Sequence, residues 1–405
     1  MASESRPIIV VTGANGGVGY GICQRLLVQL SSSYPSDAAP YDFEEKLSKE
    51  EATSPPRYAG LTLIMACRSV SRAKKARDEL LSWFDAHVRK AKSEAGYDGH
   101  AEAFQKNTVV DVEYLDLASI KTVIVFGERI SKKYPYISHL MCNAGLASFI
   151  AIDWLLAIHQ VLTSPMQAVT APMFYTQNAG ELSVDGLGWV WQCNVFGHFA
   201  LFRSLESSLS SSPLGPGRVV WCSSLEASPS FYDSSDWQLR ITEHSYESSK
   251  YEIDIIATTL DRASTSPTRI RHIVTQPGVV STNVANALVG PVLDMLKVFV
   301  FYLVRWLGSV NHPIKAYKAS VAAVHMALVP LACLAFLSHP KTPPVRYGAE
   351  TDRWGNERVG ISPVKAWLAN EEEGRELVKK CDALYEKLKK EEVRGLVSEA
   401  ASERM

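Results

Sequence analysis

The chain has 405 residues, enough for about two or three domain-sized units and a large apolar core without disulfides or metals. Its 42 Lys and Arg residues nearly balance its 43 Asp and Glu residues, and the net charge of −1 excludes the strongly basic surface typical of nucleic-acid-binding proteins. Hydrophobic residues make up 46% of the chain and charged residues 21%, which excludes a disordered or collagen-like protein. We therefore expect a globular enzyme or binding protein with no nucleic-acid partner.

The cysteine pattern indicates a reducing compartment. There are seven cysteines, an odd number, and no two of them form a CxxC pair, so neither a zinc knuckle nor a redox-active pair is expected. The histidines are scattered along the chain, and no metal site is expected from them. The polar segment Met1–Arg6 runs directly into a strand-like segment, without the basic and apolar regions of a signal peptide.

Short β-branched runs alternate with helical stretches, a pattern typical of a parallel sheet built from βαβ units. These runs are nearly continuous in apolar residues, so we expect helices on both faces of the sheet. The predicted class is therefore α/β, with a doubly wound parallel sheet. The expected strands are Ile8–Thr12, Leu61–Cys67, Val109–Leu115, His139–Cys142, Arg218–Ser223 and Arg271–Gln276.

Three segments are expected to be insertions into this core, at residues 31–58, 85–107 and 146–188. The first is rich in Ser, Pro and charged residues, and the second is charged and helical in character. The third contains apolar patches and directly follows a strand end. Because open parallel sheets bind ligands at the carboxyl ends of their strands, we expect this third insertion to border a ligand site.

A glycine-rich turn, TGANGGVG, follows the first strand and opens a helix. Gly13 allows a tight turn, Gly17 lets the backbone approach a pyrophosphate, and Gly19 lets helix and strand pack closely. Free N–H groups at the start of the helix would bind the pyrophosphate. This context predicts a dinucleotide site, with cofactor contacts expected from Thr12, Gly13, Asn15, Gly17, Val18 and Gly19.

Arg68 follows the second strand, where an acidic residue would bind the ribose 2′-hydroxyl of NAD. An arginine instead suits the 2′-phosphate of NADP, although a solvated arginine at a helix start is the plainer alternative. Asp116, after the third strand, has two open interpretations. It can accept from the adenine amino group, or it can cap the helix that begins near Ala118. We therefore predict NADPH/NADP+ as the cofactor.

Tyr246 and Lys250 stand four residues apart in the run YESSK, which places them on one face of a helix. A nearby ammonium group lowers the pKa of a tyrosine, which is otherwise too high for acid–base catalysis at neutral pH. Ser223 and Ser224 end the fifth strand, where a hydroxyl can bind a substrate carbonyl. Asn194 is expected in mid-helix, a position that disfavours Asn and therefore indicates a functional role.

Together these motifs resemble the short-chain dehydrogenase/reductase family over roughly residues 7–285. The resemblance rests on TGANGGVG, the NAG run at Asn143, NVFGHF at Asn194, the paired serines, YESSK and the Pro277–Val279 run. It implies a Rossmann-type fold. The serine-bearing strand, the long Ser-to-Tyr gap, the 146–188 insertion and the apolar C-terminal third are similar to the fungal 3-keto-steroid reductases of sterol C-4 demethylation, in ergosterol synthesis.

The resemblance implies roles for individual side chains. Tyr246 would protonate the substrate carbonyl while Lys250 lowers its pKa and holds the nicotinamide ribose. Ser224 would polarise the carbonyl, although Ser223 competes for this role, and Asn194 would support a water chain to Lys250. Asn15 departs from the family pattern, since this turn position is often basic in NADP enzymes. Further cofactor contacts are implied for Asn143, Tyr246, Lys250, Pro277, Val279 and Thr282.

The resemblance also implies a division of the chain. Residues 1–285 would form the dinucleotide-binding catalytic core, and residues 286–362 a segment that covers the substrate, associates with a membrane and completes the core. Residues 363–405 would form an amphipathic C-terminal helix. The expected reaction is NADPH-dependent reduction of a 3-keto sterol. The alternatives are another carbonyl, retinoid or 17-ketosteroid reductase, or a non-catalytic scaffold of a sterol-synthesis complex.

Leu288–Leu307 is apolar apart from Asp294, Lys297 and Arg305. A spanning helix needs about 20 mainly apolar residues, so we expect an interfacial helix, or a helix that covers the substrate. Pro330–Leu337 is a second short apolar patch. We therefore expect peripheral attachment to the cytosolic face of the endoplasmic reticulum, or to lipid droplets. Besides a sterol substrate and the membrane surface, other enzymes of C-4 demethylation are expected partners.

Overall fold

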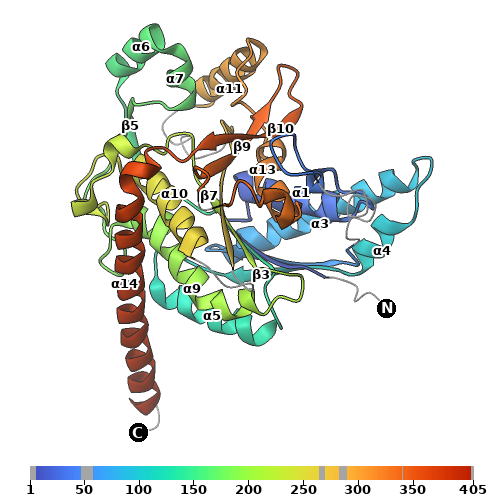
Figure 1. Ribbon diagram of the computed structural model, residues 1–405, viewed down its shortest axis with the longest axis horizontal. Helices are drawn as coiled ribbons and strands as arrows, with labels where there is room; N and C mark the ends of the chain where they lie inside the picture. The colour runs from blue at the N-terminus through green and yellow to red at the C-terminus, as the bar shows by residue number, and fades with distance from the viewer. Residues whose placement is uncertain (1–5, 47–57, 264–269, 282–289, 340, 403–405) are drawn as a thin grey trace.

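The computed structural model describes residues 6–46, 58–263, 270–281, 290–339 and 341–402 (Figure 1). A single eight-stranded sheet lies at its centre, parallel except for one antiparallel edge strand. This topology confirms the predicted α/β class with a Rossmann-type doubly wound sheet. From that antiparallel edge, the strands are β10 (Glu357–Pro363), β9 (Val345–Thr351), β8 (Arg271–Gln276), β7 (Arg218–Cys222), β4 (His139–Cys142), β1 (Ile8–Thr12), β2 (Leu61–Cys67) and β3 (Thr108–Tyr114).

The predicted strands agree closely with this sheet. Four of them have the expected bounds, β3 begins and ends one residue earlier than expected, and β7 ends one residue earlier. The central strands β1, β2, β4 and β8 are buried at every position, which explains why β1, β2 and β4 are mostly apolar; β8 buries Arg271, His272, Thr275 and Gln276 as well. Strands β9 and β10 lie in the stretch near residues 346–360 that was expected to complete the core.

Helices cover both faces of the sheet, and alternate residues of each strand pack on opposite faces. In β1, Val10 packs with the helices of one face, whereas Ile9 and Val11 pack with those of the other. The first face carries α5 (Ile120–Lys133), α9 (Gly197–Ser210), α10 (Ser245–Ala263) and, outside them, α14 (Trp367–Ser402). The second face carries α1 (Gly17–Leu30), α3 (Val70–Lys92), α12 (Ala316–Ala319) and α13 (Val321–Leu328).

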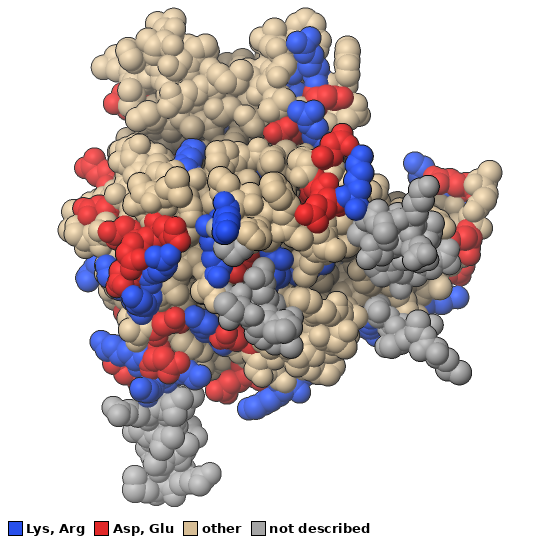
Figure 2. All heavy atoms as spheres, viewed as in Figure 1, with Lys and Arg blue, Asp and Glu red and all other residues tan. Residues whose placement is uncertain are grey.

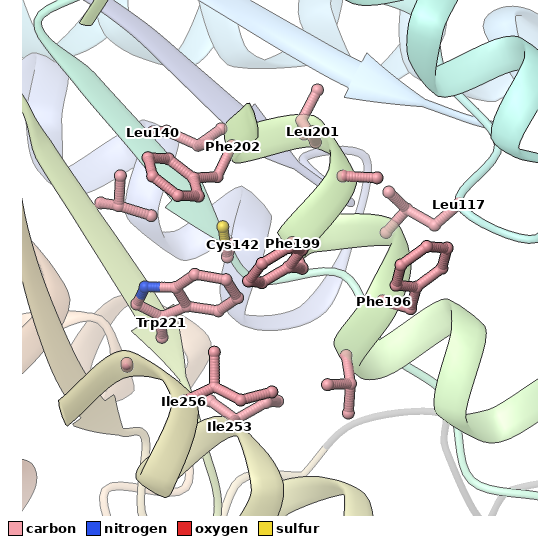
Figure 3. Packing of buried hydrophobic residues seen from close by; sticks show 14 of the residues in the cluster. Leu117, Leu140, Cys142, Phe196, Phe199, Leu201, Phe202, Trp221, Ile253 and Ile256 are labelled. Atoms are coloured by element: carbon pink, nitrogen blue, oxygen red, sulfur yellow. The ribbon is translucent and has the colours of Figure 1, made fainter. Parts of the chain in front are cut away.

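Large aromatic side chains fill the core between the sheet and α9 (Figure 3). Trp221 of β7 and Phe199 of α9 are both fully buried. Ile253 and Ile256 approach them from α10, so one packed cluster joins β7, α9 and α10. This cluster fixes α10 relative to the carboxyl end of β7.

The 146–188 insertion forms an arm of its own. Strands β5 (Phe149–Ile152) and β6 (Tyr175–Gln177) pair as an antiparallel hairpin, and α6 (Trp154–Thr163) and α7 (Pro165–Thr170) lie between them. In Figure 1 this arm projects from the upper end of the molecule, near α11 (Pro291–Trp306). The second insertion extends α3 to Lys92 and adds α4 (His100–Lys106). In the first, the short helix η1 (Ser36–Ala38) and Glu44 pack against His325 of α13.

The C-terminal third completes the body. Helix α14 buries Leu377, Cys381 and Tyr385 against the face that carries α5 and α10. The Pro330–Leu337 patch contributes Cys333 and Leu334 to the core on the opposite face, so these two side chains are not part of an exposed apolar surface. Among the described residues, no helix combines the length and apolar character needed to cross a bilayer.

Candidate active site

The predicted site residues converge at the carboxyl edge of the central strands. The sheet runs β4-β1-β2 on one side and β4-β7-β8 on the other, so the direction of strand progression reverses between β1 and β4. Folds of this class form their ligand crevice at such a reversal. The glycine turn after β1, the NAG run after β4, the serines after β7 and the Pro277 run after β8 all lie at this edge.

The glycine turn has the geometry of a phosphate cradle. Gly13 and Gly17 have positive φ angles of 66° and 51°, which favour glycine. A Cβ atom at Gly19 would lie 2.4 Å from the Gly13 carbonyl oxygen, so only glycine allows this approach of helix to turn. Gly16 occupies the cap position just before α1 and has no side chain to accept a hydrogen bond. No acidic residue stands in the first turn of the helix. The helix start therefore offers backbone N–H groups to an anion.

The Thr12 side chain lies between the ends of β1 and β4. Its side chain is fully buried, and its hydroxyl oxygen accepts hydrogen bonds from the backbone N–H groups of Asn143 and Ala144, each at 2.9 Å. The hydroxyl also lies 2.9 Å from His198 Nε2. Thr12 therefore joins the ends of β1 and β4, and its cofactor contact stays a prediction. Asn143 donates to the Thr12 carbonyl at 3.0 Å and is half-buried beside the turn.

Arg68 immediately follows β2, and its side chain is exposed to solvent. Asp116 is half-buried and accepts a hydrogen bond from the Ala118 N–H at 3.0 Å. It does not cap α5, because that helix begins at Ile120 and Asp185 accepts its first N–H at 2.7 Å. The helix-cap interpretation of Asp116 is therefore wrong.

The stretch after β8 forms backbone hydrogen bonds with residues 311–314. Gly278 has a φ of 68°, and the Val279 N–H donates to the Asn311 carbonyl at 2.7 Å. The Val279 carbonyl accepts from the Ile314 N–H at 3.0 Å. Both backbone groups of Val279 are thus paired with this neighbouring segment, and its cofactor contact stays a prediction. Pro277 lies half-buried at the same edge, and Thr282 lies outside the described residues.

Three predicted catalytic side chains meet between β7 and α10. The Ser224 hydroxyl oxygen accepts the Glu226 N–H at 3.2 Å and lies close enough to the Tyr246 phenol to lower its pKa. Lys250 Nζ lies 5.8 Å from the centre of the Tyr246 ring and donates to the Cys222 carbonyl at 2.9 Å. The Ser223 hydroxyl instead donates to the Lys250 carbonyl at 3.2 Å, so it faces α10. Ser224, not Ser223, is the serine that faces the phenol.

The electrostatics of this trio differ from the sequence prediction. Burial raises the pKa of the Tyr246 phenol well above its ordinary value of 10, the charge of Glu226 raises it further, and the nearby Ser224 hydroxyl lowers it. Burial also lowers the pKa of Lys250. The net shift of the Tyr246 pKa is therefore upward, opposite to the direction expected from Lys250. The physical reason is that burial dominates, while the ammonium group is directed to the Cys222 carbonyl.

Asn194 is fully buried in a π-helix, Gln192–Phe196, that leads into α9. Its amide group pairs with both backbone groups of Leu146, at 2.8 and 2.9 Å, and donates to Ser249 at 3.0 Å. A Cβ atom at Gly145 would lie 3.2 Å from Asn194 Oδ1 and 3.5 Å from Lys250 Nζ, so Asn194 and Lys250 flank the same glycine. π-Helical turns are common at functional sites.

Two residues at this site were missed by the sequence analysis. Glu226 is half-buried, and its charge acts on Tyr246 and Lys250. Burial raises the pKa of its carboxyl group to about 8, with Glu247 raising it further and Lys250 lowering it. Gln177, at the end of β6, contacts the start of α10. Neither residue belongs to a motif, and no sequence signal identified them.

Comparison with proteins of known name shows to which family this chain belongs. The 3-keto-steroid reductase of Schizosaccharomyces pombe is 30% identical over 372 residues, which cover 91% of this chain and 94% of that protein. The Aspergillus fumigatus 3-keto-steroid reductase is 31% identical, covering 87% of this chain and 79% of that protein. This chain belongs to the 3-keto-steroid reductase family. The resemblance inferred from the sequence is therefore confirmed. No family model matches the chain.

Solved structures with a similar fold are more distant. The Pseudomonas aeruginosa RhlG/NADP active-site complex has a TM-score of 0.49 at 14% identity, covering 81% of this chain and 91% of that one. Salutaridine reductase from Papaver somniferum has a TM-score of 0.47 at 15% identity, covering 80% of this chain and 96% of that one. The fold assignment of this chain rests on its own strand order.

Proposed function

We propose that this chain reduces the 3-keto group of a sterol intermediate to a 3-hydroxyl group, with NADPH as reductant, during C-4 demethylation in ergosterol synthesis. The observation that carries the proposal is the gathering of Ser224, Tyr246 and the buried Lys250, whose Nζ lies 5.8 Å from the centre of the Tyr246 ring, at the carboxyl edge of the sheet. The similarity to 3-keto-steroid reductases, over 91% of the chain for one of them, supports a 3-ketosterol as substrate.

The residues at the ends of β1 and β2 suit NADPH. The uncapped start of α1 presents N–H groups to the pyrophosphate, and Gly13, Gly17 and Gly19 give the backbone room to approach it. The positive charge of exposed Arg68 complements the negative charge of the 2′-phosphate. When bound there, NADPH supplies the hydride that the carbonyl carbon accepts.

Tyr246 is the proposed proton donor. At neutral pH the phenol is protonated, as a proton donor must be, and its raised pKa makes the transfer depend on stabilising the phenolate that is left. Tyr246 donates this proton to the carbonyl oxygen, which becomes the 3-hydroxyl group. The Ser224 hydroxyl orients the same oxygen. The Lys250 ammonium stabilises the phenolate that remains until solvent returns a proton.

The proposal is tested by incubating the purified chain with NADPH and a 3-ketosterol, a 17-ketosteroid or retinal in separate reactions. We expect NADPH oxidation and a 3-hydroxysterol product, identified by mass spectrometry, with the 3-ketosterol. Turnover of the 17-ketosteroid or retinal alone would replace the substrate assignment. NADPH binding without turnover of any of the three would favour the scaffold alternative.

We also propose peripheral attachment to the cytosolic face of the endoplasmic reticulum membrane or to lipid droplets, where a sterol and other C-4 demethylation enzymes would be met. No Asp, Glu, Lys or Arg occurs between Asp153 and Glu181, and the α6–α7 lobe is almost free of charge in Figure 2. Helices α6 and α11 expose large apolar side chains, which would bind the lipid interface. These are Trp154, Leu155, Ile158, Val161, Leu162, Val292, Met295, Leu296, Phe299 and Trp306.

A vesicle flotation assay tests the membrane proposal. We expect the chain to float with phosphatidylcholine vesicles, and Leu155→Glu combined with Phe299→Glu to reduce the bound fraction at least about fivefold, because buried charge opposes interfacial insertion. Val125→Glu on α5 serves as the matched control, since Val125 is also exposed but lies on a helix at the opposite end of the molecule (Figure 1). Equal flotation of all variants would refute attachment through α6 and α11.

A further inference from the structure

The β5–β6 hairpin lies against the first turn of α10, the turn that carries Tyr246. Gln177 is the last residue of β6, and its side chain is buried. Its Oε1 atom accepts a hydrogen bond from the Tyr246 N–H at 2.8 Å and another from the Ser245 hydroxyl at 3.1 Å. Its Nε2 atom donates to Glu247 Oε2 at 2.5 Å. One amide group therefore binds three consecutive residues of the catalytic helix.

These contacts replace a local helix cap. The first N–H groups of a helix have no partner within it, and a Ser, Thr, Asp or Asn just before the helix usually accepts one of them. Here His244 precedes α10, and the acceptor for the Tyr246 N–H comes from Gln177, 69 residues earlier in the chain. The same stretch of chain supplies Asp185 to the first N–H of α5. The insertion thus caps two core helices.

The hairpin also contacts the Tyr246 side chain. The Phe149 ring of β5 lies 5.8 Å from the Tyr246 ring in an edge-to-face arrangement, and it stacks on Tyr175 of β6 at 4.7 Å. The hairpin therefore restrains both the backbone and the ring of Tyr246. A displacement of about 1 Å in a reacting group can lower a rate about a hundredfold, so this restraint bears directly on proton transfer.

We propose that Gln177 is a positioning residue, through which the apolar arm of residues 146–188 holds Tyr246 in place for proton donation. The inference rests on the proposed reductase function for its catalytic consequence. Its structural part, that Gln177 caps α10, is independent of any activity. No substrate or cofactor contact is assigned to Gln177.

Substitutions that exchange the donor and acceptor provide the test. Gln177→Ala removes all three hydrogen bonds, and we expect kcat to fall about ten- to a hundredfold with NADPH affinity within about threefold of wild type. Gln177→Glu keeps an acceptor for the Tyr246 N–H but places a carboxylate against Glu247, so kcat should be low at pH 8 and recover as the pH falls. Two other titratable groups interact with Glu247. His244 Nδ1 lies 3.5 Å from Glu247 Oε1, and the charge of Glu247 raises the pKa of Glu226. Both residues are unchanged in these variants.

The double variant Gln177→Glu with Glu247→Gln restores one donor and one acceptor across the contact. We expect it to recover kcat to within about threefold of wild type and to lose the pH dependence of the single Gln177→Glu variant. Gln167→Ala is the matched control, because Gln167 lies in α7 of the same arm with an exposed side chain. It should behave as wild type.

Amide hydrogen exchange of residues 245–250 gives a readout that does not depend on catalysis. We expect Gln177→Ala to accelerate exchange in this turn at least about tenfold, and the double variant to restore the wild-type rate. Unchanged exchange and unchanged kcat in Gln177→Ala, or no rescue by the double variant, would overturn the inference. A wild-type chain without reductase activity would instead refute the proposed function, while the exchange data would still decide whether Gln177 caps α10.

Discussion

Replacing Glu226 by Gln should change how the stability of this protein depends on pH. Burial raises the pKa of the Glu226 carboxyl group from about 4.5 to about 8, so the folded chain keeps a proton that the unfolded chain loses in this window. Stability therefore falls as the pH rises from about 4.5 to 8, and the loss is complete above pH 8. A glutamine side chain does not titrate in this window, so the Glu226→Gln variant should lack this loss.

The size of the effect follows from the pKa difference. At about 1.4 kcal/mol per pKa unit, a fully sealed carboxyl group would lose about 5 kcal/mol. Glu226 is only half-buried, and solvent screening reduces the expected loss to about 1–2 kcal/mol. Urea unfolding of both proteins at pH 5 and pH 9 measures it. The variant should be more stable than wild type by about 1–2 kcal/mol at pH 9 and nearly equal at pH 5.

The control is Glu243→Gln, because Glu243 is exposed and stands three residues before Tyr246. It should follow the wild-type pH dependence. Identical pH dependence in wild type and Glu226→Gln would refute the reasoning, since it would show that Glu226 is solvated and carries an ordinary pKa.

Two further predictions concern the cofactor site. Gly19→Ala should destabilise the fold by about 1–3 kcal/mol in urea unfolding, because its Cβ atom would lie 2.4 Å from the Gly13 carbonyl oxygen. Gly16→Ala, whose Cβ would meet nothing within 4 Å, should unfold within about 0.5 kcal/mol of wild type, and an equal loss in both would contradict the argument. Arg68→Ala should weaken NADPH at least about tenfold and NADH less than threefold in fluorescence titrations, whereas exposed Lys74→Ala should change neither. Equal losses for both nucleotides with Arg68→Ala would remove the 2′-phosphate assignment.

The strands were predictable because the central strands are buried on both faces and therefore read as mostly apolar runs. The β5–β6 hairpin was not predictable from its pattern. Phe149–Ile152 is only four residues long and apolar throughout, so periodicity does not distinguish strand from helix. Its strand character comes from pairing with Tyr175–Gln177 across two intervening helices.

The site was predictable where chemistry follows local spacing, as for Tyr246 and Lys250 on one helix face. It was not predictable where side chains meet only in the folded chain. Gln177 acts on a residue 69 positions further on, and the direction of the Tyr246 pKa depends on burial and on Glu226. Local spacing placed Lys250 near Tyr246, but not the Cys222 carbonyl to which its ammonium group donates.

The central claim is that the Tyr246 phenol donates the proton to the substrate carbonyl. Steady-state turnover of a 3-ketosterol by Tyr246→Phe, measured together with NADPH affinity, tests it most directly. The phenylalanine ring can keep the packing with Phe149, so we predict NADPH affinity within about threefold of wild type and a fall in kcat of about a hundred- to ten-thousandfold. A variant that binds NADPH normally and retains more than a tenth of the wild-type kcat would contradict the account.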